Sequence, residues 1–473
     1  MERRNRYFFL VLILAGLLIR IYTASDLYLH SWDERYHALV AKHLLQHPLK
    51  PTLYENPVLA YDYRDWGINH IWLHKQPLPM WSIAGSLYLF GINEWAVRLP
   101  SILLSTVGIG LTFYIGRYWF STRTAFIAAF LYAVNGLIIE LSAGRTATDH
   151  PDVFFLFFTE LAVYLAILQA QRRQIVYTVL AGLGIGCAVL CKWLPALVIW
   201  PVWLLIVWDS GAFSRRQLAA HSSLLVVVTL ATFLPWQWYI HWQYPLEAAW
   251  EAAYNTRHFF ETLEGHDSSF FYFAGRWRID YGELIYLPLA WFCWQLIRQR
   301  KDLRYWALLT WFLIPMLFFS LARTKMQAYI LFTAPALFLI TAHFYTWLEQ
   351  HRLQGYRRWL QYLVLFLLIA LPLRYCVERA KPFDHAERNP SWAQQLKNLP
   401  ERHNNKIVLF NYDAAIEAMF YTDFAAVYTY IPDIVVIRDL QQKGYTIWIN
   451  DNERVPEAMR GTAGLVLRKF ATP

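Results

Sequence analysis

Long apolar runs separated by short polar segments dominate the chain as far as residue 376. Each run is close to the roughly 20 residues with which an α-helix crosses the hydrocarbon core of a membrane. The pattern predicts about eleven transmembrane helices, near residues 7–24, 98–118, 124–142, 152–170, 175–191, 194–208, 217–235, 281–298, 304–321, 327–346 and 359–376. The expected fold for 1–376 is therefore an all-α polytopic membrane domain.

The positions of the basic residues predict how these helices are oriented. Arginines precede the first run, which is long and is followed by no small-residue cleavage site, so we interpret it as a retained signal anchor with a cytoplasmic N-terminus. Counting from there, every loop assigned to the inside is basic, as in RQRKDLR at 298–304. The segment 26–97, a few short loops, the loop 236–280 and the tail from residue 377 are then expected outside.

The first external segment and the tail differ in pattern. In 26–97, Tyr36, Leu39, Val40 and Leu44 recur at helical spacing, which predicts an amphipathic helix lying along the membrane interface. A second such helix is expected after Pro79. In 377–473, short β-rich runs such as KIVLFNY and YTIWIND alternate with helical ones. This alternation predicts a small soluble α/β domain.

Composition narrows the class of protein further. Of the 473 residues, 57% are apolar and only 16% are charged, which is below the share typical of soluble domains. The net charge of +9 is accounted for by basic cytoplasmic loops, and no nucleic-acid readout pattern accompanies it. The four cysteines form no CxxC pair, so we expect no disulfide framework.

Two adjacent acids follow the first predicted helix within a few residues. Asp33 and Glu34 would point about 100° apart on a helix, so one can face a reacting centre while the other supports it or binds a metal. The structural alternative is a pair of helix N-terminal acids, favoured by the helix dipole, with Ser31 as the cap. Spacing alone leaves both interpretations open.

A second polar loop, SAGRTATDHPDVFF at 142–155, places Arg145, Asp149 and His150 at the outer end of two predicted helices. One interpretation is a helix-cap aspartate before a proline. The other is a second functional acid opposite Asp33 across an outward-facing cavity. Asp152 lies just beyond the proline.

Cations and histidines on the outer side are the remaining candidates. Cations at the outer ends of apolar segments are either interfacial anchors or ligands for a lipid phosphate, and they are Lys75, Lys192, Arg323 and Lys325. Histidines in the external loops could hold a divalent cation together with acids, and these are His74, His258 and His266.

Several short motifs occur in an order that resembles a known family. They are WDE after the first helix, HKQPLPMW at 74–81, FGINEWAVRLPS at 90–101, GRTATDHPDVFFLFF at 144–158, CKWLP at 191–195 and TKMQAYILFTAP at 324–335. Together they resemble the bacterial glycosyltransferases related to protein O-mannosyltransferases and to the aminoarabinose transferases that modify lipid A. The resemblance runs from Arg6 to about Tyr375. The tail resembles the family only in being a soluble outer domain of the sort that such enzymes carry.

The resemblance implies a GT-C fold and transfer of a hexose or pentose from a polyprenyl-phosphate donor. By that likeness Asp33 is the leading catalytic acid, with Glu34 beside it, and Asp149 matches the second acidic position. Lys75 matches the lysine of a Lys-Pro-Pro motif whose first proline is replaced here by Gln76. Donor-phosphate binding is expected of Lys75, Arg145, Lys192, Arg323 and Lys325.

The implied setting is the outer, periplasmic face of a bacterial inner membrane, with the active site and the C-terminal domain outside. The expected partners are the lipid-linked donor, a lipid, protein or glycan acceptor, and membrane lipids, and nucleic acid is not among them. The transfer is expected to invert the configuration at the anomeric carbon. A divalent metal is a possible cofactor. The alternative function is a transporter or flippase of lipid-linked sugars, which is expected to carry its ionisable groups near the bilayer midplane in repeated halves.

Overall fold

The computed structural model describes residues 2–351 and 353–472, which divide into two compact units. Unit 1 takes the described residues of 1–23, 101–143 and 148–381, and unit 2 takes 24–100, 144–147 and those of 382–473. The boundary between the units falls inside one helix, α4 (Glu94–Trp119). Segment 24–100 therefore belongs to the same unit as the C-terminal part of the chain. The predicted domain boundary at residue 376 stays a prediction.

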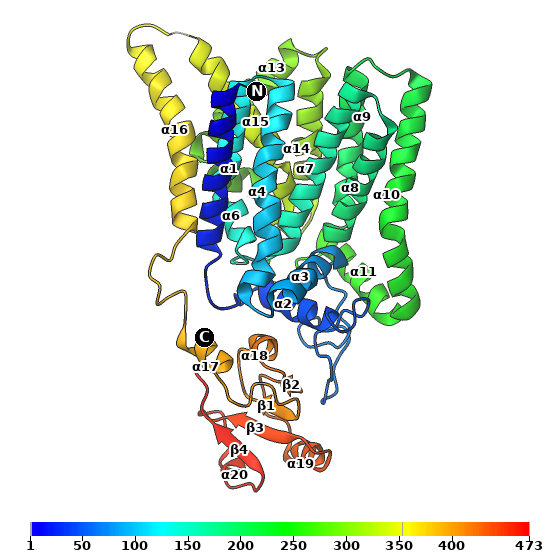
Figure 1. The fold of residues 1–473 in the computed structure, drawn as a ribbon, viewed down its shortest axis with the longest axis vertical. Helices are drawn as coiled ribbons and strands as arrows, with labels where there is room; N and C mark the ends of the chain where they lie inside the picture. Colours follow the sequence, from blue (N-terminus) through cyan, green and yellow to red (C-terminus); the bar gives the residue numbers. More distant parts are fainter. Residues whose placement is uncertain (1, 352, 473) are drawn as a thin grey trace. The chain divides into compact units, whose positions relative to one another are not determined.

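Unit 1 is helical (Figure 1). Besides most of α4, it contains α1 (Arg3–Thr23), α5 (Thr122–Ala133), α6 (Gly136–Ser142), α7 (Asp149–Arg172), α8 (Ile175–Lys192), η1 (Leu194–Val198), α9 (Ile199–Asp209), α10 (Arg215–Gln243), α11 (Pro245–Phe260), α12 (Tyr272–Asp280), η2 (Glu283–Ile285), α13 (Tyr286–Arg298), α14 (Leu303–Leu321), η3 (Gln327–Thr333), α15 (Ala334–Gln350) and α16 (Tyr356–Arg379). Helices α7, α8 and α10 run side by side.

The membrane-spanning helices account for the apolar runs of the sequence. Among the described residues, eight helices are long and apolar enough to cross a membrane, or nine if α5 and α6, bent by 49° at their junction, form one span. The eleven predicted spans each coincide with helix, but two of them are short: η1 with α9, and η2 with α13. The chain is therefore a multi-pass membrane protein, and the predicted count of eleven exceeds the number of full-length spans.

Unit 2 combines two helices of the first external segment with an α/β fold. The helices are α2 (Asp33–Leu44) and α3 (Pro77–Phe90). The C-terminal elements are α17 (Ser391–Lys397), β1 (Ile407–Phe410), α18 (Ala415–Tyr421), β2 (Ala426–Val427), α19 (Ile434–Gln442), β3 (Thr446–Asn450), α20 (Glu457–Arg460) and β4 (Leu465–Arg468). The four strands form an all-parallel sheet in the order β2-β1-β3-β4. The predicted α/β fold of the tail is confirmed.

The surroundings of α2 bear on one prediction. Leu39, Val40 and Leu44 are buried, and they belong to the same hydrophobic core as Ile416 and Phe420 of α18. The apolar face of α2 therefore packs against protein and not against lipid, and the prediction that the helix lies along the membrane interface stays a prediction. Amphipathic spacing gives the same signal for both partners, because either one removes the apolar stripe from water.

Candidate active site

Asp33 begins α2, and its partner comes from the start of α3. Lys75 precedes Pro77, the first residue of α3, where a proline suits a helix N-terminus because its missing N–H is not needed there. The Lys75 Nζ lies 3.7 Å from Asp33 Oδ2, and both side chains are partly exposed, at 22% and 16%. The predicted Ser31 cap is wrong, because the cap position is Trp32 and its side chain makes no capping hydrogen bond. The start of α2 and the segment just before α3 thus bring an acid and a cation together, within reach of solvent.

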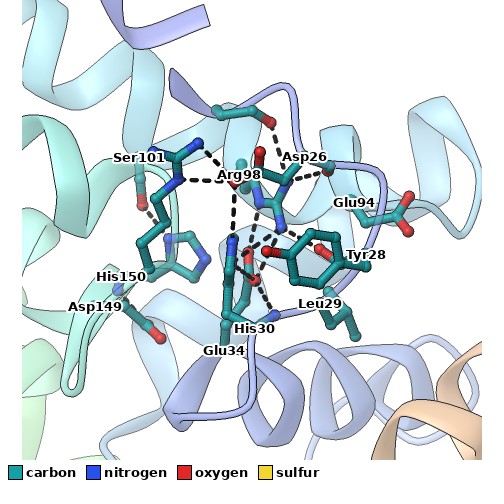
Figure 2. Close-up of polar contacts among 12 residues, drawn as sticks. Asp26, Tyr28, Leu29, His30, Glu34, Glu94, Arg98, Ser101, Asp149 and His150 are labelled. Carbon is teal, nitrogen blue, oxygen red and sulfur yellow. Dashed lines mark hydrogen bonds and ion pairs between the residues drawn. The ribbon is translucent and has the colours of Figure 1, made fainter. Parts of the chain in front are cut away.

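Glu34, the next residue, is buried and forms a two-pronged ion pair with Arg98 of α4. Arg98 Nε donates to Glu34 Oε1 at 2.6 Å, and Arg98 Nη2 donates to Oε2 at 3.0 Å. The backbone N–H of His30 donates to the same Oε2 at 2.8 Å (Figure 2). Both carboxylate oxygens thus accept hydrogen bonds. These bonds tie Glu34 to the His30 backbone and to Arg98, and so hold the first turn of α2 in place.

Asp26 extends this buried network toward two more arginines. Its Oδ2 accepts from Arg145 Nε at 2.7 Å and contacts His30 Nε2 at 3.0 Å, and its Oδ1 accepts from Arg388 at 2.9 Å. Burial by itself raises the pKa of Asp26, but the hydrogen bond with His30 and the charges of Arg145, His30 and Arg98 outweigh burial and hold this pKa below its ordinary value. Arg145, predicted to bind phosphate, is here an ion-pair partner of Asp26.

The loop that carries Arg145 approaches Glu34 closely. Gly144 has a φ of +73°, a backbone conformation that residues with a side chain rarely adopt. A Cβ at this position would also collide with the Glu34 carboxylate. Glycine is therefore required here for two reasons. The buried network around Glu34 and Asp26 explains why Gly144 and Arg145 stand side by side in the motif that begins at residue 144.

Asp149 lies in unit 1, at the first residue of α7, and is buried. Its Oδ1 accepts a hydrogen bond from the His150 backbone N–H, and the His150 Nδ1 contacts Ser101 Oγ at 2.8 Å (Figure 2). Thr148 before it has a φ of +70°, which is uncommon for a β-branched residue. Strained backbone of this kind gathers at functional sites, which makes this turn a candidate for one.

A second acid–lysine pair lies in unit 1. Lys192, at the end of α8, forms an ion pair with the buried Asp152, and its Nζ lies 4.7 Å from the ring centre of Tyr329. Trp193 follows with a φ of +77°, again strained for a bulky residue. Asp152 lies in the first turn of α7, where the helix dipole favours a negative charge.

Arg323 and Lys325 lie between α14 and η3, beside the loop that follows α11. Thr324 N–H donates to the His258 carbonyl at 3.0 Å, and Lys325 N–H donates to the His266 carbonyl at 3.3 Å. Arg323 is exposed, whereas Lys325 is buried and its Nζ donates to the Ser268 carbonyl at 3.0 Å. Burial lowers the pKa of Lys325.

The three histidines proposed as metal ligands occupy different surroundings. His74 stacks on Trp66 in unit 2, with ring centres 4.6 Å apart. His258 contacts the Tyr254 carbonyl through Nδ1 at 2.9 Å in unit 1. The described parts of the chain contain no group of three or more His, Cys, Asp or Glu side chains that could hold a metal ion. The assignment of these histidines to a metal site therefore stays a prediction, and we derive no chemistry through a metal.

Known proteins that resemble the chain agree with this architecture. The family model described as dolichyl-phosphate-mannose-protein mannosyltransferase matches residues 74–239. An undecaprenyl phosphate-α-4-amino-4-deoxy-L-arabinose arabinosyl transferase of Pseudomonas aeruginosa is 28% identical over 304 residues, covering 59% of this chain and 52% of that protein. A homologous transferase of Pseudomonas fluorescens is 27% identical over 328 residues, covering 67% and 58%. The chain thus spans little more than half the length of these relatives.

Solved structures extend the likeness to almost the whole chain. ArnT from Cupriavidus metallidurans bound to undecaprenyl phosphate has a TM-score of 0.63 at 17% identity, covering 92% of this chain and 87% of that one. The archaeal oligosaccharyltransferase AglB from Archaeoglobus fulgidus, in complex with an inhibitory peptide and a dolichol-phosphate, has a TM-score of 0.57 at 15% identity, covering 90% and 65%. The chain has the GT-C fold.

This result confirms the predicted resemblance and fold class. The family match begins at His74 and so includes Lys75, Arg98, Arg145, Asp149 and Lys192, whereas Asp33 lies before it. Asp33 belongs to unit 2 and Asp149 to unit 1. The predicted pairing of these two acids across a cavity therefore stays a prediction.

Sequence reasoning missed the partners that surround Glu34. Asp26, His30 and Glu34 follow one another at intervals of four residues, a spacing that brings side chains together on a helical turn and could have indicated a cluster. Arg98 lay inside one of the motifs without an assigned role. Arg388 had no local signal, because it reaches Asp26 from 362 positions along the chain.

Proposed function

We propose that the chain is an integral-membrane glycosyltransferase that moves a sugar from a polyprenyl-phosphate donor to a lipid, protein or glycan acceptor. The observation that carries the proposal is the Asp33–Lys75 pair, an acid and a cation 3.7 Å apart where two external helices begin. The named activities of the relatives, polyprenyl-phosphate pentosyl transfer and dolichyl-phosphate-mannose transfer, support the same donor class. The fold neighbours that hold undecaprenyl phosphate or a dolichol-phosphate support it as well.

The chemistry required by such a donor matches the residues present. The sugar leaves a lipid phosphate, so negative charge accumulates on the phosphate oxygens as the glycosidic bond breaks. Cations held near that position stabilise this charge more in the transition state than in the ground state. We assign this role to Lys75 and Lys192, and a supporting role in attracting the anionic headgroup to Arg323 and Lys325.

The acids have distinct proposed roles. For a hydroxyl acceptor, Asp33 accepts the proton as the oxygen attacks the anomeric carbon. For an acceptor that is already ionised, such as a phosphate, Asp33 orients the reactants instead. Asp149 is the proposed second acid, and Glu34 acts on Asp33 only by fixing the start of α2 through Arg98. Attack opposite the departing phosphate inverts the anomeric configuration.

The proposed location is a bacterial inner membrane, with the N-terminus in the cytoplasm and unit 2 on the periplasmic side. The basic loops support this orientation, since lysine and arginine concentrate on the cytoplasmic side of membrane proteins. The relatives support a bacterial envelope setting, since they are transferases of undecaprenyl phosphate-linked sugars. The alternative, a flippase of lipid-linked sugars, gains no support from any relative or structural neighbour named above.

A transfer assay tests the proposal directly. Purified protein in detergent or proteoliposomes is given undecaprenyl phosphate donors carrying either 4-amino-4-deoxy-L-arabinose or a hexose, together with a lipid, peptide or glycan acceptor. We expect release of free undecaprenyl phosphate and a glycosylated acceptor from one donor–acceptor pair. A protein that moves the intact donor across the bilayer without cleaving it is a flippase and contradicts the proposal.

The matched variants are Asp33→Asn and Asp62→Asn, which remove one acid each from the same external segment. Asp62 pairs with Arg64 at the surface and lies outside the site. We expect the first variant to lose transfer and the second to retain it. Equal activity of the two folded variants would remove Asp33 from its role.

A further inference from the structure

The C-terminal α/β part of unit 2 contacts the segment that carries Asp33 at successive positions on both sides of that residue. The contacting groups are Arg388, Lys397, Glu417, Tyr421 and the carbonyl groups at the C-terminal end of α18, which we call the splint. All of them, and the segment they hold, lie within unit 2. The contacts fall before Asp33, directly after it, and at the far end of α2.

Before Asp33, the splint fixes the chain as it enters α2. Arg388 donates to the carboxylate of Asp26 at 2.9 Å, and the Leu27 N–H donates to the Arg388 carbonyl at 2.7 Å. Lys397 Nζ donates to the Leu27 carbonyl at 2.6 Å. Backbone groups in an irregular segment have no helix or sheet partners, so these contacts define its path.

Tyr421 adds a contact that links three parts of the unit. Its hydroxyl oxygen accepts from the Leu29 N–H at 2.9 Å, and its O–H donates to Glu94 at 2.6 Å. Lys397 also pairs with Glu94 at 2.6 Å, and its Nζ lies 5.0 Å from the centre of the Tyr421 ring. Removing this single hydroxyl takes away both hydrogen bonds without creating an unpaired charge.

Directly after Asp33, the splint holds α2 itself. Arg35 Nη1 donates to Glu417 Oε1 at 3.2 Å, and Glu417 is only 1% exposed. The Arg35 guanidinium also lies 5.0 Å from the ring centre of Tyr36, which limits the directions open to it. A buried carboxylate with an arginine partner is a fixed point, because separating the pair leaves a buried charge uncompensated.

At the far end of α2, a lysine caps α18. Lys42 Nζ donates to the carbonyls of Met419 at 2.9 Å, Phe420 at 3.2 Å and Thr422 at 2.6 Å. These carbonyls stand at the C-terminal end of α18, where the helix has unsatisfied acceptors and partial negative charge. Between the two polar ends, Leu39 and Val40 are buried in the core that they share with α18. Helix α2 is thus fixed to α18 along its length.

We propose that the splint is a positioning device for catalysis, which makes the C-terminal α/β part an essential component of the site and Glu417 and Tyr421 positioning residues for Asp33. The inference rests on the proposed function, because it needs Asp33 to act on the reactants. Its physical basis is that small displacements of a reacting group cost rate steeply. Asp33 lies two positions from Arg35 and four from Leu29, so loosening either contact displaces it.

The test compares Glu417→Gln and Tyr421→Phe with the matched control Asp413→Asn. Asp413 belongs to the same α/β part, but it pairs with Arg454 at the surface, and none of the splint contacts described above involves it. The transfer assay measures kcat and the KM for the donor in the full chain. We expect both splint variants to lower kcat by about tenfold with KM changed less than about twofold, since positioning acts on the chemical step. We expect the control to match the parent protein.

Hydrogen exchange of the peptide covering residues 27–44 provides a second readout. It is expected to speed up in Tyr421→Phe and Glu417→Gln while the helices of unit 1 keep their protection. Unchanged kcat and unchanged exchange in Tyr421→Phe would overturn the inference, and so would a loss of activity that only follows loss of folded protein. If Asp33→Asn itself transfers sugar normally, the proposed function fails. If Asp33→Asn is inactive but the splint variants are fully active, only the present inference fails.

Discussion

Asp33 and Glu34 are neighbours on α2, yet their side chains have different surroundings. Asp33 is partly exposed beside Lys75, which lies two residues before the next helix, with 3.7 Å between the charged atoms. Glu34 is buried and bonded through both oxygens to Arg98. The two positions differ by about 100° around the helix axis, and this rotation alone separates a solvent-facing acid from a core acid. Adjacent acids in a motif therefore need not share a role.

The largest expected effect is the loss of stability on breaking the buried pair of Glu34 and Arg98. Arg98→Met leaves Glu34 and Asp26 buried with less compensating charge, which costs about 3–5 kcal/mol for a broken buried pair. We expect a marked loss of folded protein, measured by thermal unfolding and by recovery from size-exclusion chromatography.

The control for Arg98 is Arg64→Met, which removes an exposed arginine that pairs with Asp62. A fully exposed pair contributes little to stability because water and salt screen it, so this variant is expected to unfold at nearly the parent temperature. Replacing both charges, as in Arg98→Met with Glu34→Leu, should recover part of the lost stability. A fully stable Arg98→Met protein would contradict a structural role for the pair.

Substitution of the exposed acid, Asp33, should change the activity and leave the stability almost unchanged. Asp33→Asn removes an acid that is not part of the buried network, so its unfolding temperature should stay close to that of the parent. Its transfer rate should fall by about 10²–10⁴-fold if Asp33 accepts the proton of a hydroxyl acceptor. An acceptor that is already ionised should show a smaller loss, so the size of the effect also reports on the acceptor class.

The substitution Lys75→Met tests whether Lys75 binds the phosphate of the donor. Loss of one charge-assisted contact to the lipid phosphate should raise the KM for the donor by about tenfold, an energy of about 1.4 kcal/mol. It should also lower kcat, because the departing phosphate loses a cation that stabilises its charge in the transition state. Lys75→Arg should keep part of the affinity. Lys443→Met, which removes an exposed lysine paired with Asp439, is the control and should leave KM unchanged. An unaltered KM in Lys75→Met would separate this lysine from donor binding.

The smallest expected effect is on the pH dependence of stability. The pKa of Asp26 lies below its ordinary value of 3.8, so this residue stabilises the fold above that pH and the contribution is lost as pH falls through its folded pKa. The net shift is opposite for Glu417, where burial outweighs the charge of Arg35 and raises the pKa, so that Glu417 favours the folded state at low pH. In Asp26→Asn the unfolding temperature should therefore fall less steeply as the pH is lowered, as measured by thermal unfolding between pH 3 and pH 6. An unchanged dependence on pH would contradict the contribution of Asp26.

Sequence reasoning found the elements better than their partners. Apolar runs of sufficient length gave the helices of unit 1, because a membrane span needs length and hydrophobicity that are visible locally. Alternating short runs gave the strands of the tail. What covers the apolar face of α2 was not predicted, since spacing shows that Leu39 and Val40 share a face but does not show that protein covers it.

The candidate site shows the same division. Asp33 and Lys75 were each found as separate candidates because both stand at polar boundaries of apolar segments, and only the structure brings their charged atoms within 3.7 Å. Lys192 was found by itself, while its partner Tyr329 lies 137 positions away and could not be seen from spacing. Arg145 was assigned to phosphate, and only the folded structure shows that it pairs with Asp26, 119 positions away along the chain.

By itself, the sequence determined that this is a polytopic helical protein with an α/β tail and that its polar residues collect in a few segments between the apolar runs. Those properties depend on local hydrophobicity and period. The tertiary structure decided which of two adjacent acids is buried, which arginines surround Asp26, and that the tail holds α2. These outcomes depend on contacts between residues far apart in the chain, where burial and charge pairing set the energy and no local pattern records them.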